Sequence, residues 1–238
     1  MNPVILEAAV ALGSLQTITN VLQAVPDLSR YLRAPFDCDA EIYAVSSGTL
    51  AFITMDYGSK NVVDESLVRT ASQITVPYDL INGDFHPQFG DQLVLKVRNG
   101  EAVARTLFFR IILRPREQDQ ARDTDSRVTQ DFTQLPTANV TVHLLAGRRY
   151  ERPPVPCLAE FFMTASSVGS LRQLYVETTN VAPPSTIPNL NRIPRDPDDQ
   201  CISDVEVPGG QQIDLSATVA LANDVVFWRM TLKELQHS

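Results

Sequence analysis

The sequence predicts an all-β protein that consists of two tandem antiparallel β-sandwich domains produced by an internal duplication, with a helix at the N-terminus. Three observations support this prediction. Short runs of β-branched and aromatic residues, typical of strands, recur along the chain of 238 residues. One phrase returns 119 residues later, at half the chain length. Helix-like spacing of apolar residues is clear only within residues 4–24.

The N-terminal segment is predicted to be helical because Leu6, Val10 and Leu15 fall on one face at helix-like spacing. We expect residues 1–28 to form a helical arm whose apolar face docks on a neighbouring subunit. The alternative is a helix packed against its own domain. Polar residues, Glu7 among them, interrupt the apolar run, so we expect no transmembrane segment. No basic residue precedes Arg30, so we expect no secretion by a signal peptide.

The repeated phrase is RYLRAPFDCDAEIY at residues 30–43 and RYERPPVPCLAEFF at residues 149–162. Seven of its first twelve positions are identical, whereas unrelated chains of ordinary composition agree at roughly one position in sixteen. The runs TLFFRIIL at 106–113 and VVFWRMTL at 225–232 share the same offset. We infer a tandem duplication of a unit of about 100 residues; the alternative is a chance likeness between strand patterns.

Both halves of the chain are dense in short strand patterns. Short strands at this spacing predict antiparallel sandwiches or barrels. We therefore place the first sandwich at residues 29–115, a polar linker at 116–136 and the second sandwich at 137–238. The predicted strands are residues 40–45, 49–55, 72–78, 92–98 and 105–113 in the first half, and 139–145, 158–164, 172–178, 202–207, 212–221 and 225–232 in the second.

The residues that could carry catalysis or bind metal form no recognisable site. Cys38, Cys157 and Cys201 are odd in number and far apart, which predicts free thiols instead of a disulfide framework. Cys38 and Cys157 are repeat equivalents, and we interpret them as core residues in preference to nucleophiles. The histidines are scattered, and no nucleophile, phosphate or dinucleotide motif occurs. We expect no enzyme activity, no cofactor and no metal site.

Charged residues within predicted strands are the candidates for specific interactions. Glu41 and Glu160 are repeat equivalents, as are Arg110 and Arg229. A charge in a half-buried strand requires a partner, so we hypothesise ion pairs between Glu41 and Arg110 and between Glu160 and Arg229, inside each sandwich. The alternative is four solvated charges on an outer face.

Four further arginines, at repeat-equivalent positions, flank the start of each unit. They could bind carboxylates of a neighbouring subunit, since arginine is favoured at interfaces, or be solvated loop residues. The net charge of −8 argues against direct binding of nucleic acid. These arginines are Arg30, Arg33, Arg149 and Arg152.

The stretch GDQLVLKVRNGEAVARTLFFRIILRP at residues 90–115 is predicted to form a hairpin of two long strands around Asn99-Gly100. In shape it resembles the closing strands of viral jelly-roll coat domains, and two sandwiches in tandem resemble the double-jelly-roll capsid proteins of icosahedral viruses. The strand patterns give about six strands per unit, whereas a jelly roll has eight.

This resemblance implies a structural protein of a virus or phage particle, either a capsid protein or a capsid-decorating or vertex component. Its partners would be further copies of itself and other coat proteins, and it would reside in virions assembled in the host cytoplasm. The alternative is a non-catalytic carbohydrate- or protein-binding module pair. Its ligand would contact the long loops at 82–91 and 181–200, with Tyr57, Phe85 and Phe89 as candidate exposed aromatics.

Overall fold

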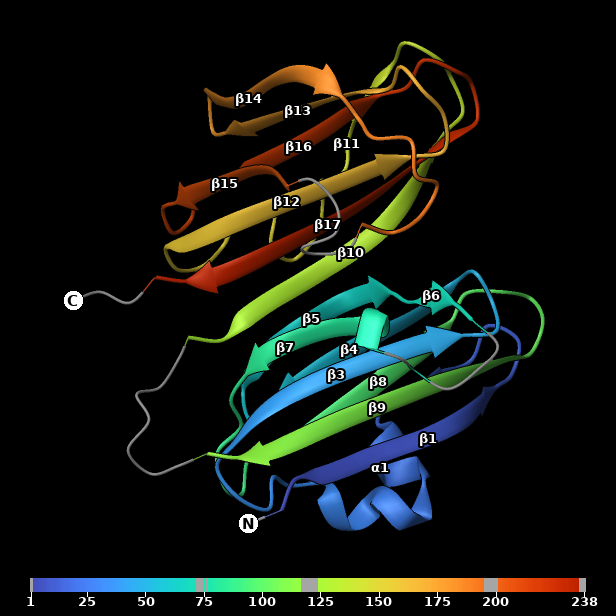
Figure 1. Cartoon of the computed structure of the whole chain (residues 1–238), viewed down its shortest axis with the longest axis vertical. Coiled ribbons are helices and arrows are strands. Elements are labelled where there is room, and N and C mark those ends of the chain that lie inside the picture. Colours follow the sequence, from blue (N-terminus) through green and yellow to red (C-terminus); the bar gives the residue numbers. More distant parts are fainter. Residues whose placement is uncertain (1, 72–74, 76, 117–123, 195–200, 236–238) are drawn as a thin grey trace. The chain divides into compact units, whose positions relative to one another are not determined.

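Alternating apolar residues fold more than half of the described residues into strands (Figure 1). The computed structural model describes residues 2–71, 75, 77–116, 124–194 and 201–235. The chain divides into two compact units, Met1–Thr129 and Gln130–Ser238, which we call unit 1 and unit 2. Both are built of antiparallel sheets, as the sequence predicts.

Unit 1 contains two sheets. One has the strand order β1-β9-β3-β7, and the short strand β6 pairs in parallel with the end of β3. The other has the order β5-β4-β8-β2. The strands are β1 (Val4–Leu12), β2 (Thr17–Ile18), β3 (Cys38–Ser46), β4 (Ala51–Tyr57), β5 (Lys60–Leu67), β6 (Arg69–Thr70), β7 (Leu80–Phe85), β8 (Leu93–Asn99) and β9 (Arg105–Pro115); the helices are α1 (Val21–Ala24), η1 (Pro26–Tyr31) and η2 (Pro77–Asp79).

Unit 2 also contains two sheets, with the strand orders β15-β12-β17-β10 and β14-β13-β16-β11. Strand β10 begins within unit 1, at Ser126, and continues into unit 2. The strands are β10 (Ser126–Leu135), β11 (Thr141–His143), β12 (Cys157–Ala165), β13 (Leu171–Val176), β14 (Thr179–Thr186), β15 (Cys201–Val207), β16 (Ile213–Thr218) and β17 (Asp224–Glu234).

Both units have the topology of an eight-stranded jelly roll. If the main strands of each unit are lettered B to I in chain order, leaving out β6, the two sheets read BIDG and CHEF in both units. These are the paired sheets of the double Greek key. Strands β3 and β12, β5 and β14, and β9 and β17 begin and end 119 residues apart. The two units therefore match strand by strand at the offset of the sequence repeat.

Apolar side chains fill the space between the two sheets of each unit. Phe85 and Phe109 lie in the core of unit 1, and Phe161 and Trp228 in that of unit 2. Burial of a side chain of this size contributes about 1.5–3 kcal/mol. Cys38 and Cys157 are buried in the cores of unit 1 and unit 2, as expected of core residues. Burial and the neighbouring Asp39 raise the pKa of the Cys38 thiol to about 12.

The predicted N-terminal helix is wrong, because residues 4–12 form strand β1 and pair along their whole length with β9. Leu6 and Val10 are four residues apart, a spacing that fits one face of a strand as well as one face of a helix. Both point into the core of unit 1. The segment's only α-helix is α1, whose N-cap Asn20 accepts a hydrogen bond from the Leu22 N–H at 3.1 Å.

Strand β10 also departs from the predictions, because it lies within the expected linker at 116–136. Its sequence SRVTQDFTQL contains few apolar residues, so its strand pattern is weak. The strands that were not predicted are β1, β2, β5 and β7 in unit 1 and β10 and β14 in unit 2, so that each unit has eight main strands where about six were expected. The strand predicted at 72–78 lies mostly outside the described residues, and its last two residues belong to η2. Within the described ranges, no helix is both long and apolar enough to cross a membrane.

Candidate functional site

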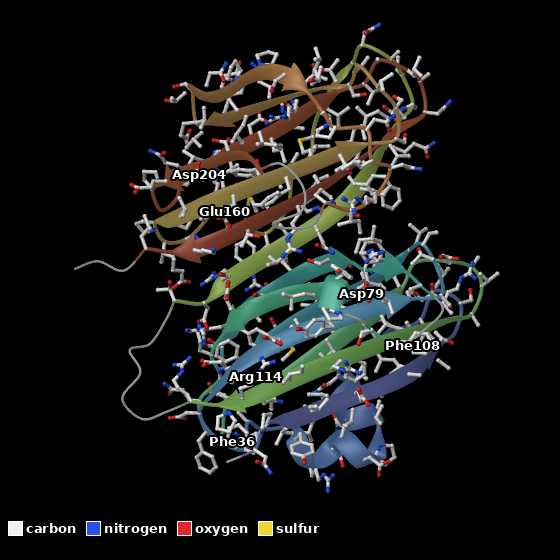
Figure 2. The ribbon with its side chains drawn as sticks, in the orientation of Figure 1. Phe36, Asp79, Phe108, Arg114, Glu160 and Asp204 are labelled. Atoms are coloured by element: carbon white, nitrogen blue, oxygen red, sulfur yellow. The ribbon has the colours of Figure 1, made fainter. Side chains whose placement is uncertain are left out.

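The outer face of the BIDG sheet of unit 1 carries the charges that we expected to pair. Glu41 binds Arg114 at 2.6 Å and accepts a hydrogen bond from the Tyr43 hydroxyl at 2.8 Å. Arg110 binds Glu7 at 2.9 Å, because these residues are directly opposite in the β1–β9 ladder. Each of the two predicted partners therefore has another counterion. Figure 2 shows Arg114 on β9, facing away from the core.

Unit 2 repeats this arrangement. Glu160 lies 3.6 Å from Lys233, at positions 119 residues beyond Glu41 and Arg114. Arg229 donates a hydrogen bond to the Gln130 side chain at 3.3 Å, where Glu160 was the expected partner. The ion pairs of both units lie on partly exposed faces, where such pairs contribute about 0–1 kcal/mol. We assign them a structural role.

Two of the predicted interface arginines hold a turn of their own unit. Arg33 donates to the Gly90 carbonyl at 2.8 Å, and Arg152 donates to the Gly210 carbonyl at 3.2 Å. Both glycines lie in the loop between the G and H strands. Arg152 also lies 3.2 Å from a carboxylate oxygen of Glu177. The same side chain therefore closes the same loop in both units.

The other two predicted arginines cover aromatic rings. Arg30 lies over the Tyr31 ring at 5.0 Å and Arg149 over the Tyr150 ring at 5.6 Å, which are cation–π distances. Both arginine side chains are exposed, as are those of Arg33 and Arg152. That they also bind a neighbouring subunit stays a prediction.

The three apolar residues expected on the docking face of the arm separate in the structure. Leu6 and Val10 are 0% and 7% exposed and belong to the core of unit 1, so neither can form a contact surface. Leu15 lies in the turn between β1 and β2 and is 65% exposed. Its N–H donates to the Glu101 carbonyl at 2.9 Å.

The B–C, D–E and H–I loops of unit 1 meet at one end of the jelly roll. Glu101 holds these loops together. Its carboxylate accepts hydrogen bonds from the backbone N–H groups of Thr49 and Leu50 in the D–E loop and forms an ion pair with Arg105, and its carbonyl accepts from the Leu15 N–H of the B–C loop. Burial acts to raise the pKa of the Glu101 carboxyl, but these partners outweigh it and hold the pKa below its usual value.

Unit 2 fastens its D–E loop with a different carboxylate. Asp224 accepts hydrogen bonds from the hydroxyls of Ser166, Ser167 and Ser170 and from the Val225 N–H. Burial acts to raise the pKa of the Asp224 carboxyl, but the three serines and the backbone donor hold it below its usual value. The loop ends of both units are therefore fixed by a carboxylate beside the first residues of the I strand.

Exposed aliphatic side chains occupy all four loops at this end of unit 2. These side chains lie in the stretches PTANV at 136–140, SSVGS at 166–170, IPNLN at 187–191, which begins the longer loop between β14 and β15, and VALAN at 219–223; none of these stretches contains a charged residue. We call these four exposed side chains the loop-tip surface. In a chain of net charge −8, a group of exposed aliphatic side chains is suited to contact with another protein. Its members are Val140, Val168, Leu190 and Leu221.

A polar cluster lies at the opposite end of unit 1. Asp39 accepts hydrogen bonds from Arg116 and from His86 Nδ1, the latter at 2.9 Å. Burial acts to raise the pKa of the Asp39 carboxyl, but Arg116 and His86 hold it below its usual value. Asp125 accepts from the His86 N–H at 3.0 Å and forms an ion pair with Lys60. These contacts join strands β3, β5, β7 and β9 to the start of β10.

The aromatics proposed for a carbohydrate site are mostly internal. Tyr57 and Phe85 are buried and stack at 6.1 Å in the core of unit 1. Phe89 is 76% exposed in the loop between β7 and β8, where its N–H donates to Asp37 at 2.7 Å. The predicted loop at 82–91 begins within β7, and the predicted loop at 181–200 begins within β14. Residues 195–200 lie outside the described residues.

The loop-tip surface was not predicted from the sequence, although a signal was present. Each of its residues is an aliphatic side chain with a small neighbour, Ser, Gly, Asn or Ala, on at least one side, as in SSVGS and ALAN. Such short neighbours cannot shield an aliphatic side chain from solvent.

No protein-family model matches the sequence, and no curated protein sequence matches it significantly. Among solved structures, the chain is similar to the major capsid protein of bacteriophage PM2, with 9% identity, a TM-score of 0.45 and coverage of 98% of this chain and 99% of that chain. A turret protein of Sulfolobus turreted icosahedral virus has 10% identity and a TM-score of 0.24, with 97% and 99% covered. A vicilin from Solanum melongena has 7% identity and a TM-score of 0.24, with 98% and 76% covered. All three TM-scores are below 0.5, so the fold is assigned from the strand topology itself.

Proposed function

We propose that this protein is a non-enzymatic structural component of a virus or phage particle that acts by self-association and by contact with other coat proteins. The observation that carries the proposal is the presence of two eight-stranded jelly rolls of the same topology in one chain. Jelly rolls are used by viral capsid domains, lectins and cupins. The matching strand offset supports a common origin of the two units by duplication.

The packed interior of each unit favours a structural role over the binding of a small molecule between the sheets. A jelly roll that binds a small molecule internally must leave room between its sheets. Here that space is occupied by large apolar side chains, including Phe109 in unit 1 and Trp228 in unit 2, both almost fully buried. The surfaces left for recognition are therefore external, and the loop-tip surface is one of them.

The mass of the protein in solution tests this proposal. We expect light scattering on the purified full-length chain to give a mass that rises with concentration towards a closed homo-oligomer, because symmetric closed assemblies are the usual result of self-association. A mass that stays at 26.4 kDa over the whole accessible concentration range would contradict the proposal.

The second candidate function is a non-catalytic carbohydrate-binding module pair, favoured by exposed Phe89 in the β7–β8 loop. An aromatic ring on a loop offers a flat apolar face for a sugar. Binding on a glycan array that is lost in Phe89→Ala, but kept when the exposed Leu221 is changed to Ala, would support this candidate.

A further inference from the structure

Strand β1 forms an open edge of the BIDG sheet of unit 1 (Figure 1). All nine of its residues pair with β9 without a bulge, and among the described strands it pairs with no other. In the part of the chain that the structure describes, the backbone of residues 4–12 has hydrogen-bond partners only in β9. The helix α1 packs mainly against η1 and against β8 of the other sheet. Strand β1 therefore offers a row of free N–H and C=O groups, which is a template for pairing with another chain.

The other strands that end the two sheets of unit 1 carry features that block such pairing. Strand β2 has only two residues, and β7 shifts its register against β3 twice. Strand β5 contains three charged residues, Lys60, Asp64 and Glu65. Short length, irregular pairing and charges all protect an edge. Strand β1 has none of these features, because it is long and regular and its single charged residue, Glu7, is neutralised by Arg110.

The alternation of side chains in β1 limits how a second strand can continue the sheet. Even-numbered side chains such as Leu6 and Val10 face the core, whereas odd-numbered ones such as Ile5, 56% exposed, face outward. A partner strand must keep each face in line. In an antiparallel pair of two β1 strands, the numbers of opposite residues must therefore add to an even number. Among these registers, only the one centred on Ala8 pairs all nine residues.

Backbone geometry and charge both favour the register centred on Ala8. Opposite residues are then both even or both odd, so their free N–H and C=O groups point at each other. Glu7 lies opposite Ala9 of the second copy, and Ile5 lies opposite Ala11, where the small alanine side chains leave room. A register centred on Glu7 would instead place two glutamates directly opposite each other, which is destabilising. In a chain of net charge −8, contacts between copies favour segments with few charges.

We propose that β1 pairs antiparallel with β1 of a second copy about a two-fold axis at Ala8, so that the two BIDG sheets become one continuous sheet. This inference rests on the proposed function, because it names the partner in self-association as a second copy. The same surface is used by both copies, so the contact closes at two chains. A larger closed assembly requires a second contact, for which the loop-tip surface is available.

Substitutions of opposite charge at Ala9 test the register. Ala9 is exposed and would lie opposite Glu7 of the second copy. We expect Ala9→Glu to weaken the association of two copies by about tenfold, because it creates two pairs of like charges across the contact. Ala9→Lys, of similar length, should associate at least as tightly as the parent. The matched control is Ala146→Glu, which adds the same charge at an exposed turn of unit 2 and should associate as the parent does.

Sedimentation of the full chain measures these dissociation constants, and unchanged far-ultraviolet circular dichroism would show that the three variants fold. Association of Ala9→Glu at the parent's strength would overturn the inference. Equal weakening by Ala9→Glu and Ala9→Lys would also overturn it, because the effect would then not depend on the charge of the opposite residue.

Cysteine pairs locate the contact directly. Ile5 and Ala11 lie opposite each other in the proposed register, at the Cα separation of about 4.5–5.5 Å that a disulfide can bridge. We expect a mixture of the Ile5→Cys and Ala11→Cys chains, treated with oxidised glutathione, to give a disulfide-linked dimer on a non-reducing gel. Neither variant alone, nor the parent, should give it.

The outcomes separate this inference from the proposed function. Association of the parent with no linked dimer in the cysteine mixture beyond that of the single variants would overturn the β1 contact and leave the proposed function standing. A monomer at every concentration would overturn both.

Discussion

Asp224 holds the loop end of unit 2 through contacts that have no counterpart at the equivalent position of unit 1. Its oxygens accept from three serine hydroxyls and one backbone N–H. The equivalent position in unit 1 is Arg105, which instead pairs with the loop-fastening Glu101. The strand positions are therefore the same in both repeats, but different residues hold the loops in each unit.

Replacing Asp224 by asparagine should destabilise unit 2. The change leaves the side chain close to its original size but exchanges one acceptor oxygen for a donor that faces serine hydroxyls. We expect a loss of about 1–3 kcal/mol, the usual cost of leaving buried polar groups unsatisfied. Urea unfolding followed by fluorescence measures it, because the chain's single tryptophan, Trp228, is buried in unit 2. Glu206→Gln, an exposed change on β15, is the control and should unfold at the parent's midpoint.

Stability should fall in acid because of three carboxylates. The pKa values of Asp39, Glu101 and Asp224 are all held below their usual values in the folded state. The unfolded chain therefore binds more protons than the folded chain, and stability rises with pH across this range. We expect the contribution of these groups to be complete above about pH 5 and to be lost as the pH falls below about 4.

Urea midpoints measured between neutral and acid pH test this dependence. Asp224→Asn should flatten the acid part of the curve, because one of the three carboxyls no longer titrates. A midpoint that stays constant or rises as the solution is acidified would be inconsistent with this assignment of the three groups.

Strand β1 is the element on which sequence and structure differ most. Its apolar residues fit a helical face, but alternate side chains enter the core of unit 1, Leu6 among them, while Ile5 faces outward. A strand at the edge of a sheet derives its stability from its long-range partner, here β9. That partner is about 100 residues away in sequence and leaves no local signal.

Alanine substitutions at neighbouring positions distinguish a core strand from a detachable arm. Leu6→Ala should cost about 2–5 kcal/mol, because it opens a cavity in a packed core. Ile5→Ala, one residue away and exposed, should change the stability of the isolated chain by less than about 0.5 kcal/mol. Thermal unfolding followed by circular dichroism measures both. Equal effects at the two positions would show that residues 4–12 do not alternate between core and surface.

Much of the fold could be predicted from the sequence, because both the repeat and the strand patterns are local. Strands β3, β9, β12 and β17 fall close to the predicted positions, with alternation that places Ala40, Phe109 and Trp228 inside. Strand β10 was missed because SRVTQDFTQL has too few apolar residues to show a period. The ion-pair partners were missed because pairing depends on register: Arg110 lies opposite Glu7, which the prediction had placed in a helix.

At the scale of the whole molecule, the repeat produces two equivalent jelly rolls whose outer surfaces are not equivalent. The loop end of unit 2 carries the exposed aliphatic loop-tip surface, whereas the loop end of unit 1 carries the Glu101–Arg105 ion pair. Under the proposed function, such differences would let the two units of one chain make different contacts with neighbouring copies.

Negative-stain imaging of the purified protein, with the mass of the same sample determined by light scattering, tests the central claim most directly. We predict closed rings or shells in which the number of similar lobes is twice the number of chains given by the mass, because each chain contributes two jelly rolls. Uniform particles of a single chain at every concentration would contradict the claim that this protein functions by assembly.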